Sequence, residues 1–233
     1  MLSQSYSDIE YIIIDGCSID DTRVIIDSYG STISICVSEP DSGIYDAMNK
    51  GVAMATGDIV AILNSDDLYE SDDVVATMVD RFIENPATDI VFGDVVFCKS
   101  QNIDHNTRLY GAKHFRSWKL RFGWMPPHPG TFIRKRAYDV VGPYSLDFKI
   151  SADYDMFIRL LYVNKLNYLW VDKVLVRMRQ GGVSTSGLRN SLLLNQEIVA
   201  ACKRNGLYTN LLLVLSKIPF KLLEFLKVRI NRV

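Results

Sequence analysis

Histidine and excess charge are both scarce in this sequence. Three histidines occur in 233 residues, and 26 basic side chains against 27 acidic ones leave a formal net charge of −1. No zinc-ligand spacing, no Ser/His/Asp order and no phosphate-binding P-loop is present. A chain with this balance lacks the basic surplus of a nucleic-acid-binding protein, so we expect no nucleic-acid partner.

Cysteine pairs and long apolar runs are also missing. The four cysteines form no C-x-x-C pair, and scattered single thiols favour a reducing compartment over a disulfide framework. No basic stretch followed by an apolar core begins the sequence, and no segment reaches the ~18 continuous apolar residues of a membrane span. We therefore interpret the chain as cytoplasmic.

The composition that is present is that of a globular protein. Hydrophobic residues make up 48% and charged residues 23% of the chain, which is enough apolar material for a sizeable core. At roughly 100–200 residues per domain, the length favours one large domain over two. We see no internal repeat and no disordered linker in it.

Strand and helix patterns alternate in the first half of the chain. Short β-branched runs predict strands at 9–15, 33–39, 59–64 and 89–97, and helical periodicity predicts helices at 22–29, from 44 to 55 and at 74–83. On the helix from 44 to 55 the apolar face consists of Ile44, Ala47, Met48, Gly51, Val52 and Ala55. This alternation predicts an α/β fold with a mostly parallel, Rossmann-like sheet flanked by helices.

The second half is less regular. Residues 99–130 are expected to be loops over a cleft, 153–163 a helix, and 167–179 one or two strands followed by a loop at 181–187. Helices are expected from there to the C-terminus. The segment 211–233 alternates apolar and basic residues, which predicts either a helix on an anionic bilayer surface or a helix packed on the domain or on a second subunit.

Neighbouring carboxylates follow the predicted strand at 59–64. Asp66 and Asp67 lie on a tight turn after an apolar run, and hard oxygen ligands of this kind suit Mg²⁺ or Mn²⁺. Because Mg²⁺ often takes only one or two protein carboxylates together with substrate phosphates, these two aspartates would suffice. The alternative is that one of them caps the helix that begins near Ser71.

Acidic residues also occur at two further positions. Asp15 and Gly16 end the predicted strand at 9–15, where the carboxylate could accept a hydrogen bond and the glycine allows close approach of a ligand. Asp153 stands at the start of a predicted helix, where it is either a cap or a general base towards a hydroxyl. We interpret Asp155 as structural.

Four segments together resemble the family 2 glycosyltransferases, which are inverting enzymes with the GT-A fold that use nucleotide sugars. They read QSYSDIEYIIIDGCSIDDT (4–22), SEPDSGIYDAMNKGVAMATGDIVAILNSDDLY (38–69), HPGTFIRK (128–135) and ISADYDMFIRL (150–160). Their order is that of the family, and they span about residues 3–185. The second segment is long and specific.

The resemblance implies a role for each of the acidic positions. Asp15, with Gly16 beside it, corresponds to the aspartate that reads the nucleotide base, and Asp153 to the catalytic base that deprotonates the acceptor hydroxyl. Asp66 corresponds to the metal ligand of the D-x-D-type motif, with Asp67 beside it and Asn64 in place of the first carboxylate.

The resemblance also implies roles for three other residues. Asn49 and Lys50 fall in the segment that borders the nucleotide pocket, while Met48 replaces an arginine found in many relatives. His128 falls in a motif near the acceptor side, and a loop hydrogen-bonding role for it is equally open.

The resemblance implies a metal-dependent enzyme that transfers a sugar from a nucleotide sugar to a hydroxyl acceptor and inverts the configuration at the anomeric carbon. We expect the donor to be UDP-linked. The acceptor expected is a saccharide or lipid-linked saccharide in surface polysaccharide or glycolipid assembly, with peripheral contact at the cytoplasmic membrane face. The Q-x-x-R-W motif of processive members is absent. Residues 1–98 would bind the donor, 99–187 would form the acceptor-side and catalytic half, and 188–233 would be a helical extension facing a membrane or partner.

One departure from the family opens an alternative. Family members have a strand and helix before the segment that matches 4–22, so the chain is expected to lack the first strand and to expose an edge of the strand at 9–15. This motivates the alternative of a non-catalytic glycosyltransferase-like binding or partner protein. A nucleotidyltransferase is a weaker alternative, because the segment around Asp153 argues against it.

Overall fold

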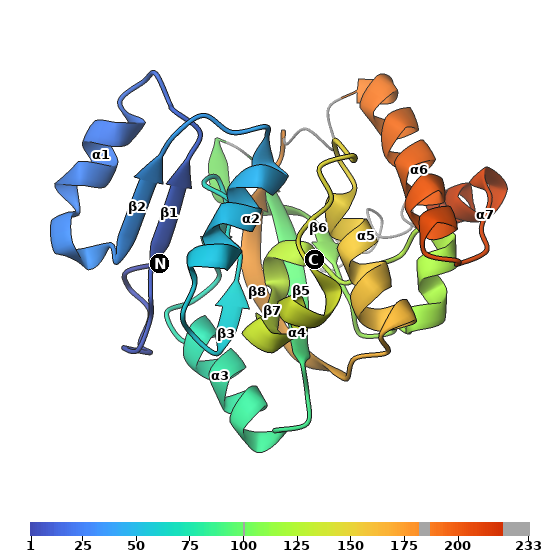
Figure 1. Cartoon of the computed structure of the whole chain (residues 1–233), viewed down its shortest axis with the longest axis horizontal. Helices are drawn as coiled ribbons and strands as arrows, with labels where there is room; N and C mark the ends of the chain where they lie inside the picture. The colour runs from blue at the N-terminus through green and yellow to red at the C-terminus, as the bar shows by residue number, and fades with distance from the viewer. Residues whose placement is uncertain (100, 182–186, 221–233) are drawn as a thin grey trace.

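The computed structural model describes residues 1–99, 101–181 and 187–220, and it places the strands in two sheets (Figure 1). β1 (Ile12–Asp15) and β2 (Ile35–Ser38) pair in parallel and form a two-stranded sheet. Within the described residues, β2 is the only strand that pairs with β1. The other edge of β1 therefore has no strand paired to it among these residues, and the side chains of β1 are half-buried or buried.

The larger sheet has six strands in the order β3-β7-β5-β8-β4, with β6 also paired to β5. β5 forms the centre because β8 lies along one of its edges while β7 and β6 share the other. The strands are β3 (Ile59–Ala61), β4 (Leu68–Tyr69), β5 (Ile90–Lys99), β6 (Asn102–Tyr110), β7 (Thr131–Arg134) and β8 (Tyr168–Arg179).

The predicted α/β class is confirmed, but the prediction of a mostly parallel sheet is wrong in its detail. Only β1–β2 and β5–β8 pair in parallel among the described strands, and the other four pairings are antiparallel. β3 and β5 do run in the same direction, as strand–helix alternation predicts, because both are antiparallel to β7. The strand inserted between them comes from far along the chain, which local periodicity cannot reveal.

The prediction of loops over all of 99–130 is also wrong. Residues 102–110 form β6, which pairs with the second half of β5 and makes a long antiparallel hairpin. Two short 3-10 helices, Ser117–Phe122 and His128–Gly130, interrupt the remaining loop before β7. The polar composition of β6 hid its strand character, because most of its residues are only half-buried.

Two hydrophobic clusters cover the two faces of the large sheet. Along β5, Ile90 and Phe92 contribute to one cluster and Val91 and Val95 to the other, as expected when successive side chains point to opposite faces. The second cluster includes α3 (Val74–Glu84). The first includes α2 (Ile44–Met54), α4 (Lys135–Val141) and α5 (Ala152–Ile158), so helices cover both faces.

The inward face of α2 is rotated relative to the predicted one. Tyr45 is buried, and Met48, Val52 and Ala55 pack against the same cluster, at spacings of three, four and three residues. Ile44, which was expected on that face, is 52% exposed. Gly51 points instead towards Ile14 of β1, so α2 lies between the small sheet and the main core.

Near the N-terminus, α1 (Thr22–Ser28) buries none of its residues and is followed by a 3-10 turn at Gly30–Thr32. After α5 the helix continues as a π-helical turn, Arg159–Val163. Both helices predicted at these places, 22–29 and 153–163, are confirmed.

The C-terminal helices are partly integrated into the core. α6 (Gly187–Arg204) packs on α5 and buries Ile198, Ala201 and Cys202. α7 (Leu211–Leu215) follows, and its Val214 is fully buried. The loop expected at 181–187 falls largely, and the basic residues from Lys221 onward fall entirely, outside the described residues. In the described part, no helix combines the length and apolar character needed to span a bilayer.

Candidate functional site

The candidate residues gather at one side of the molecule. The arrows of β1, β2 and β3 point to the same side in Figure 1, and α2 and α5 both begin there. Asp15 ends β1, Asp66 and Asp67 follow β3, and Asp153 lies in the first turn of α5. Ligands bind at the carboxyl ends of strands in α/β sheets, so we expect a ligand site on this side of the molecule.

Asp15 is buried at the end of β1 and is held by hydroxyl donors. Ser38 Oγ on β2 donates to its Oδ2 over 2.6 Å, and Ser18 donates to it through both its hydroxyl and its backbone N–H. These hydrogen bonds, that of the Ser18 hydroxyl first, lower the pKa of Asp15. The carboxylate is therefore ionised and fixed. A carboxylate has about four lone-pair positions, so capacity for a ligand remains.

Gly16, which follows Asp15 in the chain, and Lys50 of α2 both lie close to other acidic side chains of the protein. A Cβ at Gly16 would lie 2.5 Å from Asp41 Oδ2, so the space next to this glycine holds the Asp41 side chain. Lys50 Nζ lies 2.8 Å from Glu39 and donates to Pro40 O over 3.0 Å. Its pKa is raised, first by the hydrogen bond to Glu39.

The two aspartates after β3 have different surroundings. Asp66 is exposed, whereas Asp67 is 4% exposed and its Oδ2 accepts from Asn64 Nδ2 over 2.9 Å. Burial raises the pKa of Asp67 to about 6. Neither aspartate caps the helix expected near Ser71, since α3 begins at Val74 and the side chain that accepts from its first turn, at Val75 N, is that of Gln4. Asn64, in the place of the family's first carboxylate, therefore holds Asp67.

The donor set fits a divalent ion that is shared with a substrate. Among residues 1–99, 101–181 and 187–220, no group of three or more His, Cys, Asp or Glu side chains is arranged to hold a metal. An exposed Asp66 beside a fixed Asp67 offers one or two hard oxygen ligands. That is the number expected when phosphate oxygens and waters complete the shell of Mg²⁺ or Mn²⁺.

Asp153 is half-buried in the first turn of α5 and lies beside the start of α2. Tyr45 Oη lies 3.3 Å from Asp153 Oδ1, and the same hydroxyl donates to Ile150 O over 2.6 Å. Tyr154 N donates to the same Oδ1 over 2.8 Å. Burial raises the pKa of Asp153 to about 6, in spite of these hydrogen bonds. A carboxylate with this pKa can hold a proton and release it near neutral pH.

Asn49 and His128 meet at Tyr144, which stacks on Tyr45 with the ring centroids 6.1 Å apart. Asn49 exchanges two hydrogen bonds with the backbone of Tyr144, and His128 Nε2 lies 2.8 Å from the Tyr144 hydroxyl. His128 is buried, and burial lowers its pKa to about 4. Both residues thus support the aromatic side chains behind Asp153.

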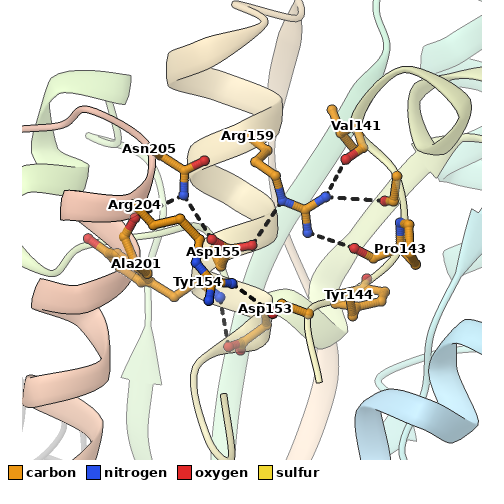
Figure 2. A network of polar contacts seen from close by, with 12 residues as sticks. Val141, Pro143, Tyr144, Asp153, Tyr154, Asp155, Arg159, Ala201, Arg204 and Asn205 are labelled. Carbon is orange, nitrogen blue, oxygen red and sulfur yellow. Dashed lines mark hydrogen bonds and ion pairs between the residues drawn. The ribbon is translucent and has the colours of Figure 1, made fainter. Parts of the chain in front are cut away.

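Asp155 and Arg159 lie two and six residues after Asp153 in the sequence. Their side chains form a largely buried ion pair (Figure 2). Arg159 Nε lies 2.9 Å from Asp155 Oδ2, and its guanidinium also donates to carbonyl oxygens after α4, including that of Pro143. Asn205 donates to the other Asp155 oxygen over 2.8 Å. The network ties α5 to the α4 loop and to the residue after α6, as expected of a structural Asp155.

Sequence reasoning missed three residues around Asp153. Tyr45 of α2 contacts Asp153, Tyr144 after α4 stacks on Tyr45, and Glu197 of α6 contacts the segment that precedes Asp153. A signal for Glu197 was present, because an acidic residue interrupts the apolar face formed by Leu194, Ile198 and Ala201. A carboxylate on a buried helix face requires partners.

Comparison with known proteins shows the family of this chain. The model of the family described as "Glycosyl transferase family 2" matches residues 1–142. A PGL/p-HBAD biosynthesis glycosyltransferase of Mycobacterium bovis is 35% identical over 161 residues, which cover 67% of this chain and 59% of that protein. Chondroitin synthase of Pasteurella multocida is 28% identical over 174 residues, covering 72% of this chain and 17% of that one.

Solved structures share the fold at low sequence identity. S. aureus TarS 1-349 in complex with UDP-GlcNAc aligns with a TM-score of 0.62 at 15% identity, covering 86% of this chain and 60% of that one. The mannosyltransferase PcManGT from Pyrobaculum calidifontis, in complex with GDP-Man and Mn²⁺, aligns with a TM-score of 0.59 at 18% identity, covering 87% and 56%. This chain spans about three fifths of the length of the mycobacterial relative and of these two structures, and 17% of chondroitin synthase. With the GT-A-like fold and a family match over more than half of its residues, the chain belongs to the glycosyl transferase family 2.

Proposed function

We propose that this glycosyltransferase moves a sugar from a nucleotide sugar to a hydroxyl acceptor with inversion, and that Asp153 is its general base. The observation that carries the proposal is the state of Asp153, which is half-buried, held by Tyr45 and Tyr154, and has a pKa of about 6. The neighbours solved with UDP-GlcNAc and GDP-Man support a nucleotide-sugar donor. We infer a UDP-linked sugar for this chain.

In the proposed reaction, Asp153 accepts the proton of the acceptor hydroxyl as its oxygen attacks the anomeric carbon. The bond from that carbon to the nucleoside diphosphate breaks on the opposite face, so one displacement inverts the configuration. Asp15 accepts a hydrogen bond from the nucleotide base through its remaining lone pairs. Asn49 and His128 keep the aromatic wall behind Asp153 in place.

Asp66, with Asp67 beside it, would hold Mg²⁺ or Mn²⁺ against the donor diphosphate. When bound, the ion neutralises negative charge on the leaving diphosphate. The Asn64 amide donates to Asp67 and so holds that carboxylate in the turn. Lys50, in the segment that the family resemblance places at the nucleotide pocket, would add positive charge there, and its amino group is paired with Glu39.

Replacement of Asp66 by alanine tests the metal assignment. We expect donor turnover in the presence of Mn²⁺ to fall about 10²-fold or more, because the diphosphate loses its charge partner. Release of UDP or GDP from UDP-GlcNAc or GDP-mannose would measure this across an Mn²⁺ titration. Asp72→Ala serves as the control, since it changes a carboxylate near the same turn outside the proposed site. Unchanged Mn²⁺ dependence in Asp66→Ala would contradict the assignment.

We also propose peripheral contact with an anionic membrane surface through 211–233, as suits a lipid-linked saccharide acceptor in glycolipid or surface polysaccharide assembly. The described part supports this, because Leu212 is 80% and Phe220 61% exposed. Deleting the whole segment is a poor test, since Val214 is fully buried and Lys217 Nζ lies 3.3 Å from Gly123 O.

Charge reversal tests membrane contact without removing the core residues of α7. We expect Lys227→Glu, Arg229→Glu and Arg232→Glu combined to abolish flotation with vesicles of phosphatidylcholine and phosphatidylglycerol, because the attraction to anionic lipid is lost. Vesicles of phosphatidylcholine alone give the baseline. Equal flotation of wild type and variant with anionic vesicles would contradict this role.

A further inference from the structure

Glu197 is a buried carboxylate on α6 that the reaction proposed above does not use. Glu197 is 9% exposed and lies on the apolar face of the helix, next to the buried Ile198. Burying an acidic side chain is costly unless it is hydrogen-bonded. Glu197 therefore needs hydrogen-bond donors around its carboxylate to be stable in this buried position.

Within the part of the chain that the structure describes, the hydrogen-bond donors to the Glu197 side chain all come from one short segment, residues 149–151, just before α5. Its Oε1 accepts from Lys149 N over 2.9 Å, and its Oε2 accepts from Ile150 N over 3.0 Å. Ser151 donates to Oε2 twice, through N and Oγ, each over 3.0 Å. Four donors thus converge on one carboxylate, which is about as many as its lone pairs can accept.

This segment sets the position of Asp153. Ser151 is fully buried and immediately precedes α5, so its backbone fixes where the helix starts and where Asp153, two residues later, lies. Hydrogen bonds from N–H groups to an ionised acceptor are stronger than those between neutral groups. Glu197 therefore holds the segment more firmly than a neutral acceptor would.

Tyr45 holds the same segment from the opposite side. Its hydroxyl donates to Ile150 O and contacts Asp153 Oδ1, whereas Glu197 accepts from Ile150 N. The peptide groups around Ile150 are thus fixed between α2 and α6. These two helices are more than 130 residues apart in the sequence.

We propose that Glu197 is a positioning residue for Asp153, through which α6 sets the placement of the general base. The proposal rests on the proposed function, because it assigns Asp153 the role of base. α6 is then a functional part of the catalytic unit. A displacement of about 1 Å in a catalytic group can cost on the order of 10²-fold in rate.

Two substitutions at Glu197 and one at its exposed neighbour Gln196 test this role. We expect Glu197→Ala to lower kcat by about 10- to 100-fold and leave KM for the donor within about twofold, because the donor contacts are elsewhere. Glu197→Gln should fall in between, since its amide oxygen still accepts while its NH₂ faces a donor. Gln196→Ala should match wild type. The probes are UDP-GlcNAc and GDP-mannose with Mn²⁺, chosen by wild-type turnover.

Hydrogen exchange of the intact variants gives a readout that is independent of turnover. We expect peptides covering 148–154 to exchange faster in Glu197→Ala than in wild type, with an intermediate rate in Glu197→Gln and no change in Gln196→Ala. If Glu197→Ala does not fold, Glu197→Gln carries the same comparison. Wild-type kcat in Glu197→Gln, or equal losses in kcat and donor affinity, would overturn the positioning role.

The two proposals fail in distinguishable ways. If wild type turns over a donor and Asp153→Asn does so equally well, the assignment of the base fails, whatever Glu197 does. If Asp153→Asn is inactive but Glu197→Ala keeps wild-type kcat, only the positioning role fails. If wild type turns over no donor, unchanged exchange at 148–154 in Glu197→Ala still overturns the positioning role of Glu197.

Discussion

Replacement of Asp153 by asparagine is expected to lower sugar transfer by about 10²–10⁴-fold, the usual contribution of a general base. Asparagine keeps an Oδ1 that can accept from Tyr154 N and Tyr45 Oη, so the geometry around it is preserved while the proton acceptor is lost. Steady-state kcat with the wild-type donor and acceptor measures the effect. Asp147→Asn, which changes an exposed carboxylate shortly before α5, is the control and should keep wild-type kcat.

The pH profile of the wild type carries the same prediction. Because burial raises the pKa of Asp153 to about 6, kcat/KM should fall as the pH is lowered through about 6, where the carboxylate becomes protonated. Retained activity in Asp153→Asn, or an acidic limb that persists in it, would contradict the assignment. If the wild type shows no turnover of any donor at any pH, the alternative of a non-catalytic binding protein is favoured instead.

Stability separates loss of chemistry from loss of fold in this variant. A carboxyl whose pKa is raised in the folded state contributes stability below its unfolded pKa, near 3.8, and loses it as the pH rises through about 6. At pH 7 the ionised Asp153 therefore opposes folding. We expect Asp153→Asn to have a Tm at pH 7 equal to or above that of the wild type, as at other sites that trade stability for activity.

Replacement of Arg159 by methionine is expected to destabilise the fold by about 3–5 kcal/mol, the usual cost of leaving one partner of a buried ion pair alone. Asp155 is 2% exposed and would keep only the hydrogen bond from Asn205 as a side-chain partner, while the carbonyls after α4 would lose their donor (Figure 2). For a chain of this length, such a loss lowers Tm by roughly 10 °C. Thermal unfolding followed by circular dichroism measures it.

A double variant and a surface control sharpen this test. Arg159→Met combined with Asp155→Leu should recover part of the lost stability, because no uncompensated charge stays buried. Arg23→Met removes an exposed pair, with side chains 47% and 62% exposed, and should change Tm little. If Arg159→Met shifts Tm no more than Arg23→Met does, the network of Figure 2 is not a stabilising one.

Local patterns predicted most elements because the hydrophobic period depends on residues close in the chain. The apolar runs at β1, β2, β3 and β5 and the 3.6-residue stripe of α3 were all recognised. β6 was missed because most of its residues are polar or only half-buried, so they show no alternating apolar pattern, and its pairing with β5 is not visible in the local sequence. The face of α2 was predicted one residue too early, since Ile44 and Tyr45 are both apolar and only packing decides which is buried.

The sequence by itself determined the α/β class, the family and the identity of the acidic residues at the strand ends, because these depend on composition, period and motif. Tertiary structure decided which strands are neighbours, with β7 inserted between β3 and β5. It also decided the environment of each carboxylate: Asp67 buried against Asn64, Asp15 held by serines, and Asp153 fixed between Tyr45 and the segment held by Glu197. A pKa depends on burial and on partners from distant parts of the chain, and only folding brings those together.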